Sequence, residues 1–357
     1  MEHSVGPVCK IILVVPCYNE AARLDLEKFR AYAAQQPGAR FLFVNDGSTD
    51  DTGIHIDRAE QDCPDLVQAV HLPANAGKRV ALAAGFARAT GEVIVTIDSD
   101  SLIDRNALLA LAGPFRDPQV GAVAGKVTVL NRFGSLLPRM LHVRFVLSFD
   151  FLRSVQSSYG TVYCCPGALS AYRASVIIPL IPSWLRQRFL GSECTIGEDR
   201  ALTNDVLAAG YRAVYQRSAV VRTLVPETYR KLCNMFLRWD RSYIREEIRL
   251  WKMMWRLPIP ALVLTILETT ITNLRYPVAY ASLGLMLYLC AQDPWTILRF
   301  LLSIGVVSLF YTLYFLHSER SREFLFGVLY AYFYFLSLLW IFPYALVTVR
   351  NRGWLTR

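Results

Sequence analysis

Four short apolar runs in the first hundred residues restrict the folds open to this chain. They occupy residues 10–15, 40–44, 68–72 and 92–97, turn residues bound them, and helical patterns at 21–35 and 79–89 lie between them. Strands that alternate with helices predict a parallel β-sheet covered by helices, which is an α/β fold. Ligands of such sheets bind beyond the carboxyl ends of the strands, so we expect the chemistry in the residues that follow each run.

Two carboxylates follow the fourth run directly. Asp98 and Asp100 would project from the end of one strand toward a common point, where oxygen ligands suit Mg²⁺ or Mn²⁺. Most Asp-x-Asp triplets are solvated turns. This one follows an apolar strand and shares its domain with the Asp-Gly-Ser-Thr-Asp segment at 46–50, so we interpret it as a metal site that contacts a diphosphate.

Charged residues also open two predicted helices. At 75–79 the cations Lys78 and Arg79 follow a glycine, and the N–H groups of a helix start favour an anion, so this segment indicates a phosphate contact or else a solvated basic turn. At 197–200 the carboxylates of Glu198 and Asp199 begin a helix that runs through 207. One of them can act as general base for a hydroxyl, although acids also favour any helix N-terminus.

A basic amphipathic segment follows the pair Arg238 and Trp239. The pair could place a guanidinium on a diphosphate and an indole against a sugar ring, or it could be a buried Trp with a salt-bridged Arg. The segment after it has cations on one helical face, and it predicts a helix at a membrane interface or an amphipathic helix packed on protein. The two faces are Arg241, Arg245, Arg249, Lys252, Arg256 and, opposite, Ile244, Ile248, Trp251, Trp255.

The chain becomes strongly apolar after residue 257. It is 54% hydrophobic overall, and the runs at 297–316 and 324–339 approach the length needed to cross a bilayer. The region 262–290 carries Glu268, Arg275 and Pro277, and we expect one long kinked helix there rather than two short ones. Its charges would face protein or an aqueous path, or Arg275 would snorkel to the membrane surface.

The charge and the cysteine content indicate which binding partners and which cellular compartment to expect. Lys and Arg exceed Asp and Glu by 38 to 29, and their placement favours a membrane surface and phosphates over nucleic acid. The eight cysteines lack metal-ligand spacing and two are adjacent, so we expect reduced, intracellular thiols. No signal peptide precedes the first run, so attachment to the membrane is expected from the C-terminal half.

Taken together, these segments resemble the inverting family 2 glycosyltransferases, within them the branch of hyaluronan and chitooligosaccharide synthases. The most specific stretch is 189–204, and support comes from 77–79, 156–160, 241–246 and 353–357. The resemblance implies a GT-A (Rossmann-like) catalytic domain at 1–235, an interfacial amphipathic helix at 236–257, and a transmembrane region of about three helical segments at 258–357. It also implies a multi-pass protein of the plasma or inner membrane with a cytoplasmic catalytic domain.

The resemblance also implies a role for each site residue. Asp199 would be the general base, and a UDP-sugar donor of GlcNAc, GlcA or both would bind with Mn²⁺ or Mg²⁺. The residues implied for the donor are Tyr18 and Glu20 at the nucleotide, Asp46 at the uracil or ribose, Lys78, Arg238 and Arg357 at the diphosphate, Asp98 at the nucleotide or metal, and Asp100 at the metal. Those implied for the glycan acceptor are Trp239, Cys164 and Glu198.

Three departures from the family pattern affect the expected product. Met235 stands where the pattern Gln-x-x-Arg-Trp has Gln, which leaves transfer of one sugar to a lipid or lipid-linked acceptor as the alternative to a polymer. An N-terminal transmembrane hairpin and a final span are both lacking, so a homo-oligomer or a partner membrane subunit would have to complete a secretion channel. A non-catalytic scaffold that binds nucleotide sugar is the remaining alternative.

The side of the C-terminal tail depends on the number of spans. The cationic tail at 350–357 indicates a cytoplasmic location, whereas three full spans would place it outside. A tail on the inside therefore requires a re-entrant or interfacial piece within 324–349.

Overall fold

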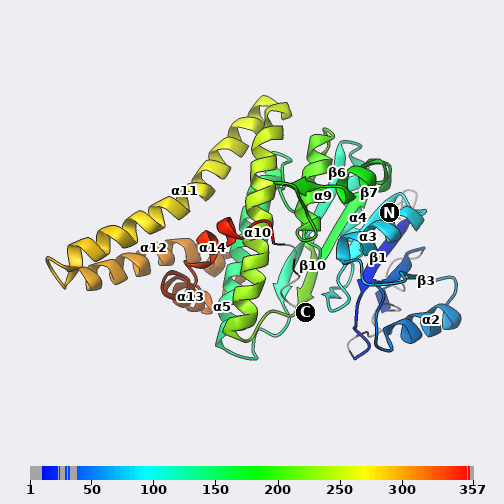
Figure 1. The fold of residues 1–357 in the computed structure, drawn as a ribbon, viewed down its shortest axis with the longest axis horizontal. Coiled ribbons are helices and arrows are strands. Elements are labelled where there is room, and N and C mark those ends of the chain that lie inside the picture. Colours follow the sequence, from blue (N-terminus) through cyan, green and yellow to red (C-terminus); the bar gives the residue numbers. More distant parts are fainter. Residues whose placement is uncertain are drawn as a thin grey trace, which may run out of the picture.

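A mixed eight-stranded sheet forms the centre of the molecule (Figure 1). The computed structural model describes residues 10–22, 24, 29, 31, 32, 38–351 and 353, so the predicted helix at 21–35 and the terminal motif lie largely outside the described residues. The strand order is β3-β2-β1-β4-β7-β6-β10-β5. The strands are β1 (Ile11–Cys17), β2 (Arg40–Asn45), β3 (Val67–His71), β4 (Val93–Ile97), β5 (Leu102–Ile103), β6 (Val120–Val129), β7 (Leu169–Arg173) and β10 (Arg212–Thr223).

The first four strands are parallel, as the apolar runs predict. Side chains alternate between two cores, because successive residues of a strand point to opposite faces. Leu13 of β1 packs on the face covered by α2 (Thr52–Asp62), while Val14 packs on the face covered by α3 (Lys78–Arg88). Both faces are therefore apolar, which is typical of strands buried under helices on both sides.

The second half of the sheet departs from the prediction. β7 runs antiparallel to β4 and β6, so the sheet is mixed rather than parallel. β6, which lies between β7 and β10, is one long strand of 10 residues. Its glycines mark close packing rather than turns, because a Cβ at Gly121 would lie 2.7 Å from Tyr211 and one at Gly125 would lie 2.8 Å from Leu169.

Two long helical segments lie beside the sheet. One consists of α5 (Leu136–Phe145), a π-helical segment (Val146–Phe151) and α6 (Leu152–Ser158). The basic segment belongs to one helix, α10 (Tyr229–Met253), which begins nine residues before Arg238 and so includes the Arg238–Trp239 pair.

The basic face of α10 packs on protein over its first turns. Arg241 and Arg245 are only 2% and 5% exposed, and they donate to the Thr348 hydroxyl and the Ile196 carbonyl. The expectation of a cationic face at a membrane surface is wrong for these two side chains, since backbone and hydroxyl oxygens satisfy their guanidinium groups. The apolar face remains exposed toward the C-terminal end, at Ile248 and Trp255.

The C-terminal helices form a hairpin and a bent pair (Figure 1). α11 (Ile259–Cys290) is the single long helix expected, with Pro277 inside it, and α12 (Thr296–Glu319) returns toward the sheet. Among the described residues, α12 is the one helix long and apolar enough to cross a membrane. α13 (Phe324–Ser337) and α14 (Ile341–Val347) pass the same test only as a pair, which is bent by 51°.

The bent pair lies against helices of the sheet-bearing part of the chain at both ends. The Arg139 guanidinium of α5 lies 5.5 Å from the Phe326 ring near the start of α13. Arg241 of α10 donates to Thr348 just after α14, at 2.9 Å. A segment that starts beside α5 and ends beside α10, which both pack by the sheet, fits a re-entrant or interfacial piece better than a full span.

Candidate active site

The loops that follow β1 and β2 are hydrogen-bonded together at the carboxyl edge of the sheet. Asn19 accepts from the Thr49 N–H at 2.9 Å, and Thr52 Oγ1 accepts from the Glu20 N–H at 2.8 Å. The Asp46 N–H donates to the Cys17 carbonyl at 2.8 Å. These bonds bring Tyr18 and Glu20, which the resemblance assigns to the nucleotide, close to Asp46.

Asp46 holds the loop that precedes α3. Its two carboxylate oxygens accept from the N–H groups of Ala76 and Gly77, at 2.8 and 2.9 Å. Gly47 has a φ of 63°, and a Cβ there would lie 2.3 Å from the Ala74 carbonyl carbon, so the two loops touch through backbone. The N–H groups of Ala76 and Gly77, just before the helix, therefore bind a protein carboxylate, and the predicted phosphate contact of this segment rests on Lys78 and the first turn of α3.

Lys78 is the one cation of its segment that faces the other charged site residues. Its Nζ lies 2.5 Å from Asp98 Oδ1 and 3.4 Å from Glu198 Oε1. Burial alone lowers the pKa of Lys78, but the carboxylates of Asp98, Glu198 and Asp199 outweigh burial and raise it above its ordinary value. Arg79 points away and donates to the Trp184 carbonyl at 2.9 Å.

Asp199 stands at the first turn of α9 (Glu198–Ala208), as predicted. Gly197, with a φ of 74°, turns the chain into this helix. One carboxylate oxygen accepts from the Arg200 N–H at 2.7 Å, and the other accepts from the Gly167 N–H at 3.3 Å and from Cys164 Sγ at 3.7 Å. Three donors thus orient a carboxylate beside the charged cluster of Lys78.

Gly167 joins the two halves of the site and was not singled out from the sequence. A Cβ at this position would lie 2.8 Å from Lys78 Nζ and 3.9 Å from Asp98 Oδ1, while its N–H reaches Asp199. A side chain here would have to displace the Lys78 ammonium group from its present position. A glycine shortly before an apolar strand is a common turn signal, so the sequence offered nothing to distinguish it.

Cys164 and Trp239 belong to one connected group of side chains. The Cys164 carbonyl accepts from Arg153 Nε at 2.9 Å, and the Arg153 guanidinium lies 4.3 Å from the Phe149 ring. The Phe149 and Trp239 rings lie 6.3 Å apart. Burial, then Asp199, raises the pKa of Cys164 to about 11, so the thiol stays neutral and donates to the carboxylate.

Glu198 and Asp98 have different neighbours from those that the sequence predicts. Glu198 is 5% exposed and pairs with Lys78, so its carboxylate lies beside the predicted donor residues, and its contact with an acceptor stays a prediction. Asp98 pairs with Lys78 and its side chain is 32% exposed. Within the described ranges, no group of three or more His, Cys, Asp or Glu side chains gathers as a metal site.

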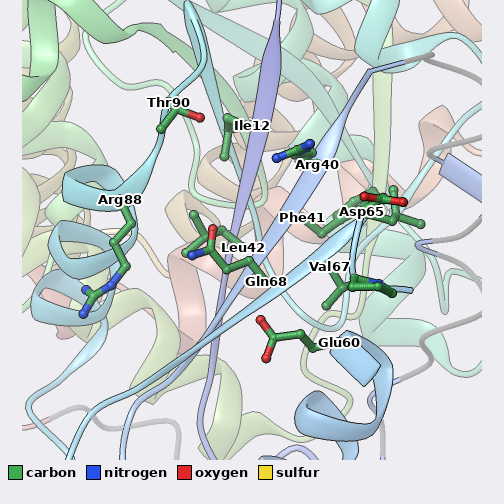
Figure 2. Close-up of a pocket in the computed structure, with 12 residues that line it drawn as sticks. Ile12, Arg40, Phe41, Leu42, Glu60, Asp65, Val67, Gln68, Arg88 and Thr90 are labelled. Atoms are coloured by element: carbon green, nitrogen blue, oxygen red, sulfur yellow. The ribbon is translucent and has the colours of Figure 1, made fainter. Parts of the chain in front are cut away.

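A separate pocket lies at the opposite end of the strands (Figure 2). Its volume is about 330 Å³, and its lining includes Arg40 and Leu42 of β2, Gln68 of β3, and Arg88 and Thr90 at the end of α3. These residues occupy the amino ends of the strands, whereas Asp98 follows the carboxyl end of β4. The pocket is therefore not part of the site built around Lys78.

The sheet and the charged cluster at its carboxyl edge define a GT-A domain. The same fold occurs in a mannosyltransferase from Pyrobaculum calidifontis solved in complex with GDP-Man and Mn²⁺, with a TM-score of 0.64 and 21% identity. The likeness covers 92% of this chain and 88% of that one. At this identity it establishes the fold.

Sequence comparison identifies the family. The chain is 31% identical to an N-acetylglucosaminyltransferase of Azorhizobium caulinodans and 34% identical to a hyaluronan synthase of Streptococcus pyogenes. Each match covers 98% of this chain, with 87% and 83% of the relatives. The Glycosyl transferase family 2 profile matches residues 12–180. The chain belongs to family 2 and is a glycosyltransferase, as the resemblance predicts.

Proposed function

We propose that the chain is a membrane-bound inverting enzyme that transfers GlcNAc, GlcA or both from UDP to a growing β-linked polysaccharide or oligosaccharide. The similarity to hyaluronan synthase and N-acetylglucosaminyltransferase over 98% of the chain supports polymer synthesis. The observation that carries the proposal is the Asp199 carboxylate. It adjoins the Lys78–Asp98 pair through Gly167, so a base and a cation for the leaving group share one site.

The proposed reaction is a single displacement. Tyr18, Glu20 and Asp46 contact the nucleoside, while Lys78 and Arg238 hold the diphosphate. Asp199 removes the proton of the acceptor hydroxyl, whose oxygen attacks the anomeric carbon. The bond from that carbon to UDP breaks, and UDP leaves with the electron pair. Attack opposite the leaving group inverts the anomeric centre.

A divalent cation completes the proposed donor site. Asp100, together with Asp98, offers the hard oxygen ligands that suit Mn²⁺ or Mg²⁺, and the position after β4 fits this use. Because Lys78 already pairs with Asp98, we assign direct ligation first to Asp100. When bound, the ion would neutralise charge on the diphosphate. The Trp239 indole and the Cys164 pocket would receive the acceptor sugar.

The proposed membrane arrangement follows the predicted division of the chain. Residues 1–235 form the cytoplasmic catalytic domain, 236–257 a connecting amphipathic helix, and 258–357 the multi-pass membrane region. The apolar α12 and the bent pair of α13 and α14 support membrane insertion. A homo-oligomer or a partner membrane subunit would complete a passage for the product.

A second candidate is transfer of one sugar to a lipid or lipid-linked acceptor. Met235 favours it, because this side chain is 7% exposed in the apolar core where the family pattern has a polar Gln. The two candidates share the donor site and the base, and they differ in product length.

One experiment tests the proposal and separates the candidates. Purified, detergent-solubilised protein is incubated with Mn²⁺ or Mg²⁺ and a panel of radiolabelled UDP-sugars, and the products are sized. A ladder or long polymer supports the synthase, and one added sugar on lipid supports the second candidate. Asp199→Asn should reduce turnover by about 100-fold or more while UDP still binds. Turnover retained in Asp199→Asn contradicts the assignment of the base, and no turnover of any donor contradicts the proposal.

A further inference from the structure

Glu246 is a buried carboxylate with no role in the reaction described above. It lies on α10 and is 1% exposed. One oxygen accepts from Gln187 Nε2, and the other accepts from Asn204 Nδ2 at 3.0 Å and lies 3.5 Å from Arg249 Nη1. A buried carboxylate is costly unless such partners satisfy it. These partners come from the 187–196 loop and from α9 as well as from α10.

Two partners of Glu246, Asn204 and Gln187, each lead to one charged residue of the active site. Asn204 belongs to α9, whose first turn carries Asp199. Gln187 accepts from Arg79 Nη1 at 2.8 Å, and Arg79 is the neighbour of Lys78 in the first turn of α3. One carboxylate therefore braces the two helices whose N-terminal ends present the base and the diphosphate-binding lysine.

The third braced element, α10, carries the predicted acceptor residue. Trp239 lies two turns before Glu246 in the same helix. Nearby contacts are tight, because a Cβ at Gly197 would lie 1.8 Å from Ser242 Oγ, and Arg245 donates to the Ile196 carbonyl at 2.6 Å. Movement of α10 would therefore move the turn that leads into Asp199.

We propose that Glu246 is a positioning residue that sets the relative places of Asp199, Lys78 and Trp239. The inference rests on the proposed function, because it takes Asp199 as the base and Lys78 as the diphosphate ligand. Glu246 touches none of the reacting groups. Its effect should appear mainly in the rate of the chemical step, since small misplacement of reacting groups lowers the rate steeply while the charge of Lys78 stays beside the donor.

The test compares Glu246→Gln with the wild type by kcat, donor KM and UDP affinity. Glutamine keeps the shape but turns one acceptor oxygen into an NH₂ donor, which must face the NH₂ of Gln187 or Asn204. We expect kcat to fall by about 10- to 100-fold while donor KM and the Kd for UDP change by less than about three-fold.

Two further variants keep the test decisive. Gln187→Ala removes the side chain that joins Glu246 to Arg79 and leaves the Asn204 bond in place. It should also lower kcat, and it serves as the test if Glu246→Gln does not fold. Asp150→Asn changes another buried carboxylate, which is 0% exposed and pairs with Lys126 and Arg217 away from this brace, and it should leave kcat unchanged. An unchanged kcat per UDP-binding site in Glu246→Gln or Gln187→Ala, with an active wild type, overturns the inference alone. An inactive wild type overturns the proposed function instead.

Discussion

At the scale of single residues, the site depends on one partly buried cation among three carboxylates. Lys78 contacts Asp98 and Glu198 directly, and Asp199 lies near enough to raise its pKa as well. Carboxylates held together without a cation repel one another and would also repel a diphosphate. Lys78 therefore keeps the acidic residues together, and under the proposed function it also offsets their charge toward an anionic donor.

Replacing Lys78 with Met should weaken donor binding. We expect the KM for the sugar nucleotide to rise by about ten-fold or more, because a charge-assisted contact to phosphate contributes about 1.5–3 kcal/mol. The control is Lys126→Met, which removes another partly buried lysine that also pairs with two carboxylates, at 3.4 and 3.0 Å, but these belong to Asp150 and Glu319 rather than to the candidate site. Equal effects of both variants on KM would contradict the assignment.

Asp240 should make stability depend on pH in mildly acidic solution. Burial raises the pKa of Asp240 from 3.8 to about 6, although Arg275, Arg144 and Arg200 oppose this rise. The folded state then holds a proton that the unfolded state releases, so this residue's contribution to stability falls as pH rises from about 4 to about 6. Asp240→Asn mimics the protonated form. Its melting temperature relative to the wild type should rise over that range, and a constant difference would contradict the shift.

At the scale of elements, the turn into α9 requires glycine for two reasons. Gly197 has a left-handed φ of 74°, and a Cβ there would lie 1.8 Å from Ser242 Oγ on α10. Any side chain must push α9 and α10 apart or rotate the turn that presents Asp199. The position of the base is therefore coupled to the helix that carries Trp239.

Gly197→Ala should cause a large loss of kcat and only a modest loss of stability. A left-handed backbone conformation destabilises alanine by roughly 1–2 kcal/mol. The contact with Ser242 would in addition displace Asp199, and we expect this displacement to lower kcat about 100-fold. Gly210→Ala is the matched control, because Gly210 has a φ of 86° and open space where its Cβ would lie. The control should show a similar loss of melting temperature and full kcat. Equal kcat in the two variants would show that the Ser242 contact does not matter.

Local patterns predicted the elements well and their long-range contacts poorly. β1 to β4 and α3 followed from apolar periodicity, because those residues are buried on the faces that their spacing implies. The sites of Lys78, Asp98 and Asp199 followed from their places at strand and helix ends. The partner of the Ala76 and Gly77 N–H groups could not be read locally, since Asp46 is 30 residues away. The contacts of Gly167, and the burial of Arg241 against residues after α14, could not be predicted for the same reason, since their partners are distant in sequence.

At the scale of the whole molecule, polar contacts fix one end of the α11–α12 hairpin to the catalytic domain. Asn273 of α11 bonds to Tyr243 and Glu247, while Glu319 and Ser318 at the end of α12 bond to Lys126 and Arg217. The tip at 291–295 lies far from the sheet (Figure 1). At about 1.5 Å per residue, the 24 residues of α12 rise about 36 Å, enough to cross a hydrocarbon core of about 30 Å.

This geometry predicts that the tip and the tail lie on opposite sides of the membrane. The bent pair of α13 and α14 begins and ends beside the catalytic domain, so residue 351 should share the side of Asp199. In a Cys290→Ala background, Gln292→Cys should react with a membrane-impermeant maleimide on intact cells, and Asn351→Cys only after permeabilisation. Reaction of both residues on intact cells would make the bent pair a full span. Protection of both would mean that the hairpin does not cross, because its tip would then share the catalytic side.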